Sequence, residues 1–319
     1  MRTTTFGIMA MTYSRHQQPS TSTLKMAAKT QPCKSDCACG GEPSRSYSAS
    51  PQGADLLKVT SPSDDFPVQK QQQTDNIAFV DNVVDLNKIL DDDLFLAVWR
   101  QANAPMFVRA LSDPSIQVED LPMFEGVVSP DTVADVMKEY LADPPYKLLS
   151  PEKHLCALDE EDLDELVDHI EQLVDVFANI SREAGFFVNA GGEQQLPSVH
   201  VKLRAVGDNA CRYWHQDCVP FRMITTYRGP CTEWVLPALS KKTLARRQFD
   251  SEHAQSLSHH DVALFKGRGD TDGDAPLRCD APGVVHRSPR TEGSGVVRLV
   301  LVLDIPDGWR KSEKKQVTP

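Results

Sequence analysis

A change of hydrophobic period near Gly185 constrains the fold more than any other feature of this chain. Over residues 159–184, apolar side chains recur every three or four residues, which is typical of one long amphipathic helix. Acidic residues fill its first turn, where the helix dipole favours negative charge, and Gly185 is expected to act as a C-cap. After Gly185, short alternating runs are separated by Pro, Gly and polar residues. The sequence therefore predicts a helical part followed by a mainly antiparallel sheet.

The short runs predict a double-stranded β-helix, the jelly-roll or cupin-like architecture, in a domain of the α+β class. The strands are expected at residues 186–188, 199–205, 211–219, 223–227, 233–236, 261–266, 283–286 and 296–305. Before the long helix, residues 93–99 are expected to begin a helix, and Asp131 to N-cap another. No GxGxxG or P-loop motif occurs, so neither a dinucleotide site nor an NTP site is indicated.

Composition divides the chain into three segments. Residues 1–75 are rich in Ser, Thr, Gln and Pro, which predicts a disordered tail. Residues 76–312 are expected to form one metal-binding domain with a helical N-terminal part, and residues 313–319 a disordered C-terminus. Because residues 1–35 hold five basic and no acidic side chains, as transit peptides do, the expected location is the cytoplasm or, if this segment is a transit peptide, an organelle.

The net charge limits the classes of partner that we expect, and the cysteines indicate the redox compartment. A net charge of −11 argues against nucleic acid, and no apolar run is long enough to cross a membrane, so a small-molecule or protein substrate is expected. Eight cysteines without disulfide-type spacing indicate a reducing compartment. Three of them, Cys33, Cys37 and Cys39, either chelate a soft metal or are unstructured reduced thiols.

The motif His215-Gln-Asp217 contains two candidate metal ligands. Two residues apart on an expected strand, His215 and Asp217 project to the same face. One imidazole and one carboxylate supply two ligands of a facial triad, whose third ligand is a histidine from a distant strand. His286 is far enough downstream to be that third ligand. Alternatively, His215 is a core histidine bonded to Asp217, and His286 caps a turn.

Arg298 follows on the next expected strand and shares a face with Val300 and Val302. A charge in such an apolar interior is costly unless it is paired, and guanidinium binds carboxylates through two parallel hydrogen bonds. We therefore predict that Arg298 binds a carboxylate co-substrate. Pairing with a structural carboxylate such as Asp304 is the alternative.

This order of motifs resembles that of the Fe(II)- and 2-oxoglutarate-dependent oxygenases: HxD, a glycine-ended strand, a distal His, then a basic residue. The resemblance implies that His215, Asp217 and His286 bind Fe(II). It also implies that Arg298 binds the C5 carboxylate of 2-oxoglutarate.

A closer resemblance, to the domain-of-unknown-function family 1826, spans roughly residues 76–306. It rests on HxDx4Rx3TYxGPxTxW from residue 215 to 234, KGR at 266–268, HRSP at 286–289, the strand at 298–304 and LAVWR at 96–100. Cys231 stands where the family usually has Gly, and it either approaches the metal or is a buried structural thiol. The family has no settled activity. Its bacterial members tend to lie among zinc-homeostasis genes, which implies a role under zinc limitation.

Three functions follow as hypotheses. The first is an Fe(II) and 2-oxoglutarate oxygenase in which Arg222, Tyr227 and Arg287 line the pocket and contact substrate. The second is a non-catalytic protein that stores or hands over Zn²⁺, supported by the tail thiols and by His253, His259 and His260, unless these three merely lie in an exposed loop. The third is a cupin-like hydrolase or isomerase that uses the same triad without 2-oxoglutarate.

Overall fold

The computed structural model describes residues 76–113, 115–142, 158–187, 193–207, 211–247, 253–268 and 283–306. The chain divides into the units Met1–Pro62 and Ser63–Pro319, and every described residue belongs to the second. The predictions for residues 1–75, including Cys33, Cys37 and Cys39, and for residues 313–319 lie outside the described residues. Within the described ranges, no helix has the length and apolar character needed to cross a membrane.

Seven strands form one sheet in the order β1-β2-β8-β5-β10-β4-β3. All neighbours are antiparallel except the parallel pair β1 and β2. The strands are β1 (Ile77–Val80), β2 (Leu96–Trp99), β3 (Phe124–Val128), β4 (Val199–Val206), β5 (Phe221–Arg228), β8 (Val262–Lys266) and β10 (Arg298–Asp304). A second, antiparallel sheet has the order β7-β6-β9, from β6 (Glu233–Trp234), β7 (Gln255–Ser256) and β9 (His286–Arg287). The predicted α+β class is confirmed.

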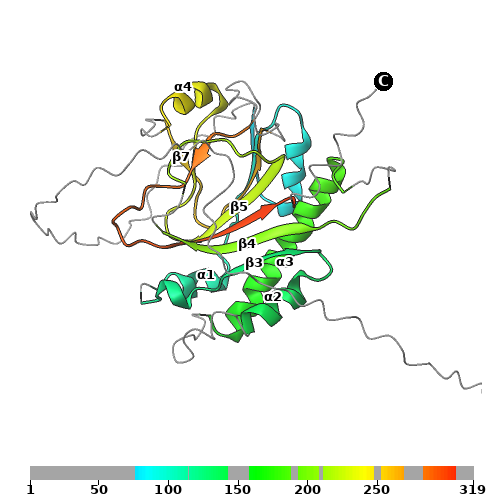
Figure 1. Ribbon diagram of the computed structural model, residues 1–319, viewed down its shortest axis with the longest axis vertical. Coiled ribbons are helices and arrows are strands. Elements are labelled where there is room, and N and C mark those ends of the chain that lie inside the picture. The colour runs from blue at the N-terminus through cyan, green and yellow to red at the C-terminus, as the bar shows by residue number, and fades with distance from the viewer. Residues whose placement is uncertain are drawn as a thin grey trace, which may run out of the picture. The chain divides into compact units, whose positions relative to one another are not determined.

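The helices differ in the face of the fold that they cover. The helices are α1 (Met106–Leu111), α2 (Val133–Ala142), α3 (Glu160–Glu183) and α4 (Ser240–Ala245), with 3-10 turns η1 (Val83–Leu90), η2 (Val118–Asp120) and η4 (Pro237–Leu239). In Figure 1, α1, α2 and α3 lie on one side of the large sheet and α4 lies on the opposite side. The side opposite α3 therefore carries the small sheet and α4.

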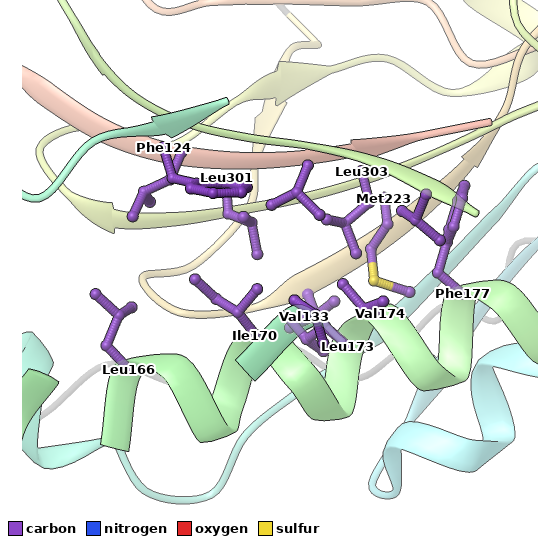
Figure 2. Packing of buried hydrophobic residues seen from close by; sticks show 14 of the residues in the cluster. Phe124, Val133, Leu166, Ile170, Leu173, Val174, Phe177, Met223, Leu301 and Leu303 are labelled. Carbon is purple, nitrogen blue, oxygen red and sulfur yellow. The ribbon is translucent and has the colours of Figure 1, made fainter. Parts of the chain in front are cut away.

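Helix α3 forms where the apolar period predicted it. Asp159 caps its start, because its carboxylate accepts a hydrogen bond from the backbone N–H of Asp162 at 2.9 Å. Gly185 follows its end with φ +89°, a conformation that favours glycine, as predicted. Figure 2 shows one face of α3 pointing at the large sheet: Leu166, Ile170, Leu173, Val174 and Phe177 meet Phe124, Met223, Leu301 and Leu303. Each such fully buried side chain contributes about 1.5–3 kcal/mol.

The opposite face of the large sheet packs on the small sheet. Ile224, Ala263 and Val300 from the large sheet share a buried apolar cluster with Trp234 of β6 and with Val284, just before β9. Because side chains alternate along a strand, each central strand gives one face to α3 and the other face to this cluster. We call the latter the inner face, and the predicted site residues cluster around it.

Two local predictions are wrong. Residues 93–99 do not begin a helix, because Leu96–Trp99 is strand β2. Leu96, Ala97 and Val98 are all buried, since both faces of the strand are covered, so their continuous apolar run carries no period that would identify a strand. Residues 211–219 form a loop in which His215 alone makes a β-bridge, and residues 186–187 form no strand.

Candidate metal centre

His215 and His286 are joined through their main chains. The N–H of each donates to the carbonyl of the other at 3.0 Å, which makes an isolated antiparallel bridge between the loop at residues 211–220 and strand β9. The two rings consequently lie 4.5 Å apart, centroid to centroid. Asp217 closes the group, and one donor atom from each of the three residues lies within 4.8 Å of the others. The structure thus brings together the three residues predicted as metal ligands.

Both imidazoles are oriented by the carbonyl two residues before them. Nδ1 of His215 lies 2.9 Å from the carbonyl oxygen of Tyr213, and Nδ1 of His286 lies 3.1 Å from that of Val284. A carbonyl only accepts, so Nδ1 carries the proton in each ring. In the neutral form of each ring, Nε2 would therefore present its lone pair toward Asp217, as in histidines that bind metals.

Asp217 has one bound and one unbound oxygen. Oδ1 accepts from Nη1 of Arg222 at 2.7 Å, whereas the buried Oδ2 has no hydrogen-bond donor and lies 3.3 Å from Nε2 of His286. Burial alone would raise the pKa of this carboxyl, but the positive charge of Arg222, with His286, holds the pKa well below its ordinary value. An ionised oxygen without a donor fits a cation between the carboxylate and the two imidazoles.

The carboxylate of Asp217 also changes the pKa of His215. Burial would lower its pKa, but the attraction of Asp217, whose Oδ1 lies 3.6 Å from Nε2, together with that of Cys211, outweighs burial and raises the pKa well above its ordinary value. A divalent cation would bind all three donor groups at once, so the residues present fit a metal ion.

Gly267 fixes the loop that carries Asp217. Its N–H donates to the carbonyl of Pro220, and the next N–H, of Arg268, donates to the carbonyl of Asp217, both at 3.0 Å. A Cβ at Gly267 would lie 1.9 Å from the carbonyl oxygen of Val219. Glycine is therefore required here because the loop crosses directly over it. The sequence identified this glycine only as the end of a strand.

Arg298 is 2% exposed and has only neutral acceptors. Its Nε donates to the carbonyl of Pro230 at 2.6 Å, and its Nη2 lies 3.4–3.5 Å from the hydroxyls of Thr232 and Thr226. Burial lowers its pKa to about 10. Asp304, the alternative partner, is bound instead by Arg222 and Lys202. No carboxylate of the described ranges forms an ion pair with Arg298, although attraction to Cys231 and Glu233 partly opposes the effect of burial on its pKa.

The three residues expected to contact substrate lie in different places. Arg222 reaches the metal centre through Asp217. Tyr227, five positions along β5, faces α3 instead, where its hydroxyl lies 3.0 Å from Nδ1 of His169. Arg287 projects from β9 on the side opposite His286, where it pairs with Glu233 at 2.6 Å and lies over the ring of Trp214. Tyr227 and Arg287 lie outside the metal centre, because strand alternation turns them away from the side of Arg222 and of His286.

The remaining candidate ligands stay outside the centre. Cys231 is buried in the apolar cluster of the inner face, and burial raises its pKa to about 11. Neither Cys231 nor His253, His259 or His260 joins a metal-type group within the described residues. The two partners of Asp304 carry no signal in the sequence, because ion pairing across strands depends on register.

Solved structures that resemble this chain include two proteins bound to the same small molecule. The dioxygenase for auxin oxidation 1 of Arabidopsis thaliana, in a binary complex with 2-oxoglutarate, is 8% identical with a TM-score of 0.37, over 73% of this chain and 92% of that one. A full-length protein of Neurospora crassa, in complex with alpha-ketoglutarate, is 10% identical with a TM-score of 0.33, over 72% and 83%. A comparison with curated proteins finds no match. The family model described as "Protein of unknown function (DUF1826)" matches residues 80–304, and the chain therefore belongs to that family.

Proposed function

We propose that this protein is an Fe(II)- and 2-oxoglutarate-dependent oxygenase. His215, Asp217 and His286 would hold the metal, and Arg298 would anchor the co-substrate. The observation that carries the proposal is that a carboxylate oxygen without a donor, on Asp217, and a buried guanidinium without a paired carboxylate, on Arg298, both lie at the inner face. A bound cation would stabilise the donor-free oxygen of Asp217, and a bound anion would stabilise the buried guanidinium of Arg298.

The inner face connects these two groups. At one end of this face Arg298 contacts Thr232, and two residues later Trp234 pairs with His286 of the metal centre at the other end. The apolar side chains between the two ends keep water out, which strengthens charge pairing there. A dicarboxylic 2-oxo acid would present one carboxylate to Arg298 and the hydroxyls of Thr226 and Thr232, and its oxo-acid end to the metal.

When bound, Fe(II) would supply the activation of O₂ that is coupled to decarboxylation of the 2-oxo acid. Nε2 of the two histidines and Oδ2 of Asp217 would hold the metal. We propose that a small molecule or a protein is the substrate. We also propose that the two sheets are the two walls of a double-stranded β-helix, supported by the apolar cluster that both of them bury.

A non-catalytic Zn²⁺ protein active in zinc homeostasis is the second candidate. Two imidazoles and a carboxylate also suit Zn²⁺, and a backbone-joined pair of histidines would bind it without further rearrangement. This candidate leaves the buried charge of Arg298 without an explanation, so we favour the oxygenase.

Anaerobic loading with Fe(II) and 2-oxoglutarate tests the oxygenase, first by the visible charge-transfer absorption of the complex and then by succinate release after O₂ is admitted. The wild type should show both signals, and His215→Ala neither. Arg298→Met should keep iron but need at least tenfold more 2-oxoglutarate, because a charge-assisted hydrogen bond contributes about 1.5–3 kcal/mol.

Arg204→Met is the matched control, since Arg204 lies on the same sheet face in an exposed pair with Glu125. It should leave both signals unchanged. Tight Zn²⁺ binding with no 2-oxoglutarate binding by the wild type would overturn the oxygenase in favour of the second candidate.

A further inference from the structure

Arg222 links the metal centre to the large sheet through both edges of its guanidinium. Nη1 donates to Oδ1 of Asp217 at 2.7 Å. Nε and Nη2 donate to the two oxygens of Asp304, at 2.7 and 2.9 Å. Because the guanidinium is planar and its donors are fixed in a fork, binding Asp304 on one edge also fixes the direction in which Nη1 points.

Asp304 is itself firmly placed. It is 3% exposed, and its Oδ2 also accepts from Nζ of Lys202 at 2.9 Å. It lies directly opposite Arg222 in the pairing of β10 with β5, two central strands of the large sheet. Side chains supported by central strands and by further hydrogen bonds hold a functional group more rigidly than loop residues do. Arg222 therefore cannot follow Asp217 if that carboxylate turns.

Asp217, by contrast, lies in the loop between β4 and β5, and its carboxylate has no other donor than Arg222 within the described residues. Oδ1, which lies 3.6 Å from Nε2 of His215, is held by Arg222, whereas Oδ2, 3.3 Å from Nε2 of His286, is the oxygen that has no donor. Without Arg222, rotation about the side chain would let both oxygens meet the same ion. The guanidinium thus decides how many oxygens Asp217 offers.

We propose that Arg222 is a positioning residue that restricts Asp217 to coordination through one oxygen. The inference rests on the proposed metal centre and gives Arg222 a role other than substrate contact. An octahedral ion with three protein ligands keeps about three positions for water, O₂ or a chelating 2-oxo acid. A two-oxygen Asp217 would occupy one of those positions and leave too few for a chelate and O₂ together.

The test counts the water molecules on bound Mn²⁺ by pulsed EPR in isotopically labelled water, with Mn²⁺ as the only added ligand. Wild type should hold about three waters and Arg222→Met about two, since a six-coordinate ion loses one open position. Arg222→Lys keeps a donor for Oδ1 and should restore the wild-type count. Arg204→Met, an exposed arginine of the same sheet face, should match the wild type throughout.

Arg222→Met leaves a buried carboxylate that Lys202 alone neutralises, and it could fail to fold. The double variant Arg222→Met with Asp304→Asn removes that charge as well and should also hold about two waters. A wild-type water count in either folded variant would overturn the positioning role while leaving the metal centre intact. Failure of the wild type to bind Mn²⁺ would instead overturn the proposed centre, so the two failures are distinguishable.

Discussion

The two faces of the large sheet differ in what their side chains do, although the same strands supply both. On β10, Leu299, Leu301 and Leu303 pack in the core under the helices, whereas Arg298 and Asp304 lie on the inner face with buried charges. The helix-facing side gains stability from apolar burial. The inner face contributes less stability, because buried charges are stabilising only when they are fully paired.

A single residue step along each central strand therefore separates the side chains that stabilise the fold from those that build the site. A change on one face should therefore leave the properties of the other nearly intact, as distant sites without shared partners behave independently. Three predictions test this separation.

Stability should fall most when a large side chain is removed from the core under the helices. Phe177 of α3 is fully buried against the large sheet, so Phe177→Ala should lower the free energy of unfolding by about 3–5 kcal/mol. Denaturant unfolding measures that loss, and the affinity for Mn²⁺ should stay within about twofold of wild type. Val136→Ala, at an exposed position of α2, serves as the control. Loss of metal affinity in step with stability would show that the two faces are coupled.

A smaller effect is expected from pH on the helix-facing side. Burial lowers the pKa of His169 to about 4, against about 6.5 in an unfolded chain. The unfolded chain then binds the proton more readily, so stability should be complete above pH 6.5. It should fall between about pH 6.5 and 4, by at most about 3 kcal/mol. His169→Asn should flatten this part of the stability curve, and the exposed His259→Asn should not. An unchanged slope in His169→Asn would assign the pH dependence to other groups.

The smallest loss of stability, but a selective loss of metal, is expected at Gly267. A Cβ there would press on the backbone of the loop that carries Asp217, so Gly267→Ala should cost about 1–3 kcal/mol. It should also weaken Mn²⁺ binding more than tenfold, as measured by titration, because the carboxylate is displaced. Gly207→Ala, where a Cβ meets nothing within 4 Å, should change neither quantity. Normal metal affinity in Gly267→Ala would mean that this crossing does not set the site.

The long helix and the three converging residues could be predicted from local patterns in the sequence. The apolar period gave the bounds of α3 to within a residue at either end, and the order of HxD, distal His and Arg selected the residues that converge. Strand β2 was missed because a strand covered on both faces has no alternation to detect. Arg222 and Tyr227 are an odd number of residues apart on β5, so alternation alone already argued against grouping them.

The pairing of Arg222 with Asp304 could not have been predicted from the sequence. It depends on the register of β5 against β10, which side-chain packing across the whole sheet determines. The same holds for the crossing at Gly267, where the requirement for glycine arises from a segment about fifty residues earlier in the chain.

The backbone bridge between His215 and His286 has a consequence for metal choice. Main-chain hydrogen bonds already set the spacing of the two imidazoles. The two histidines are therefore brought together without a bound ion. A site prepared in this way accepts several first-row divalent ions, whose intrinsic affinities follow a fixed chemical order. For the proposed centre, the supply of each ion would then decide which metal is bound.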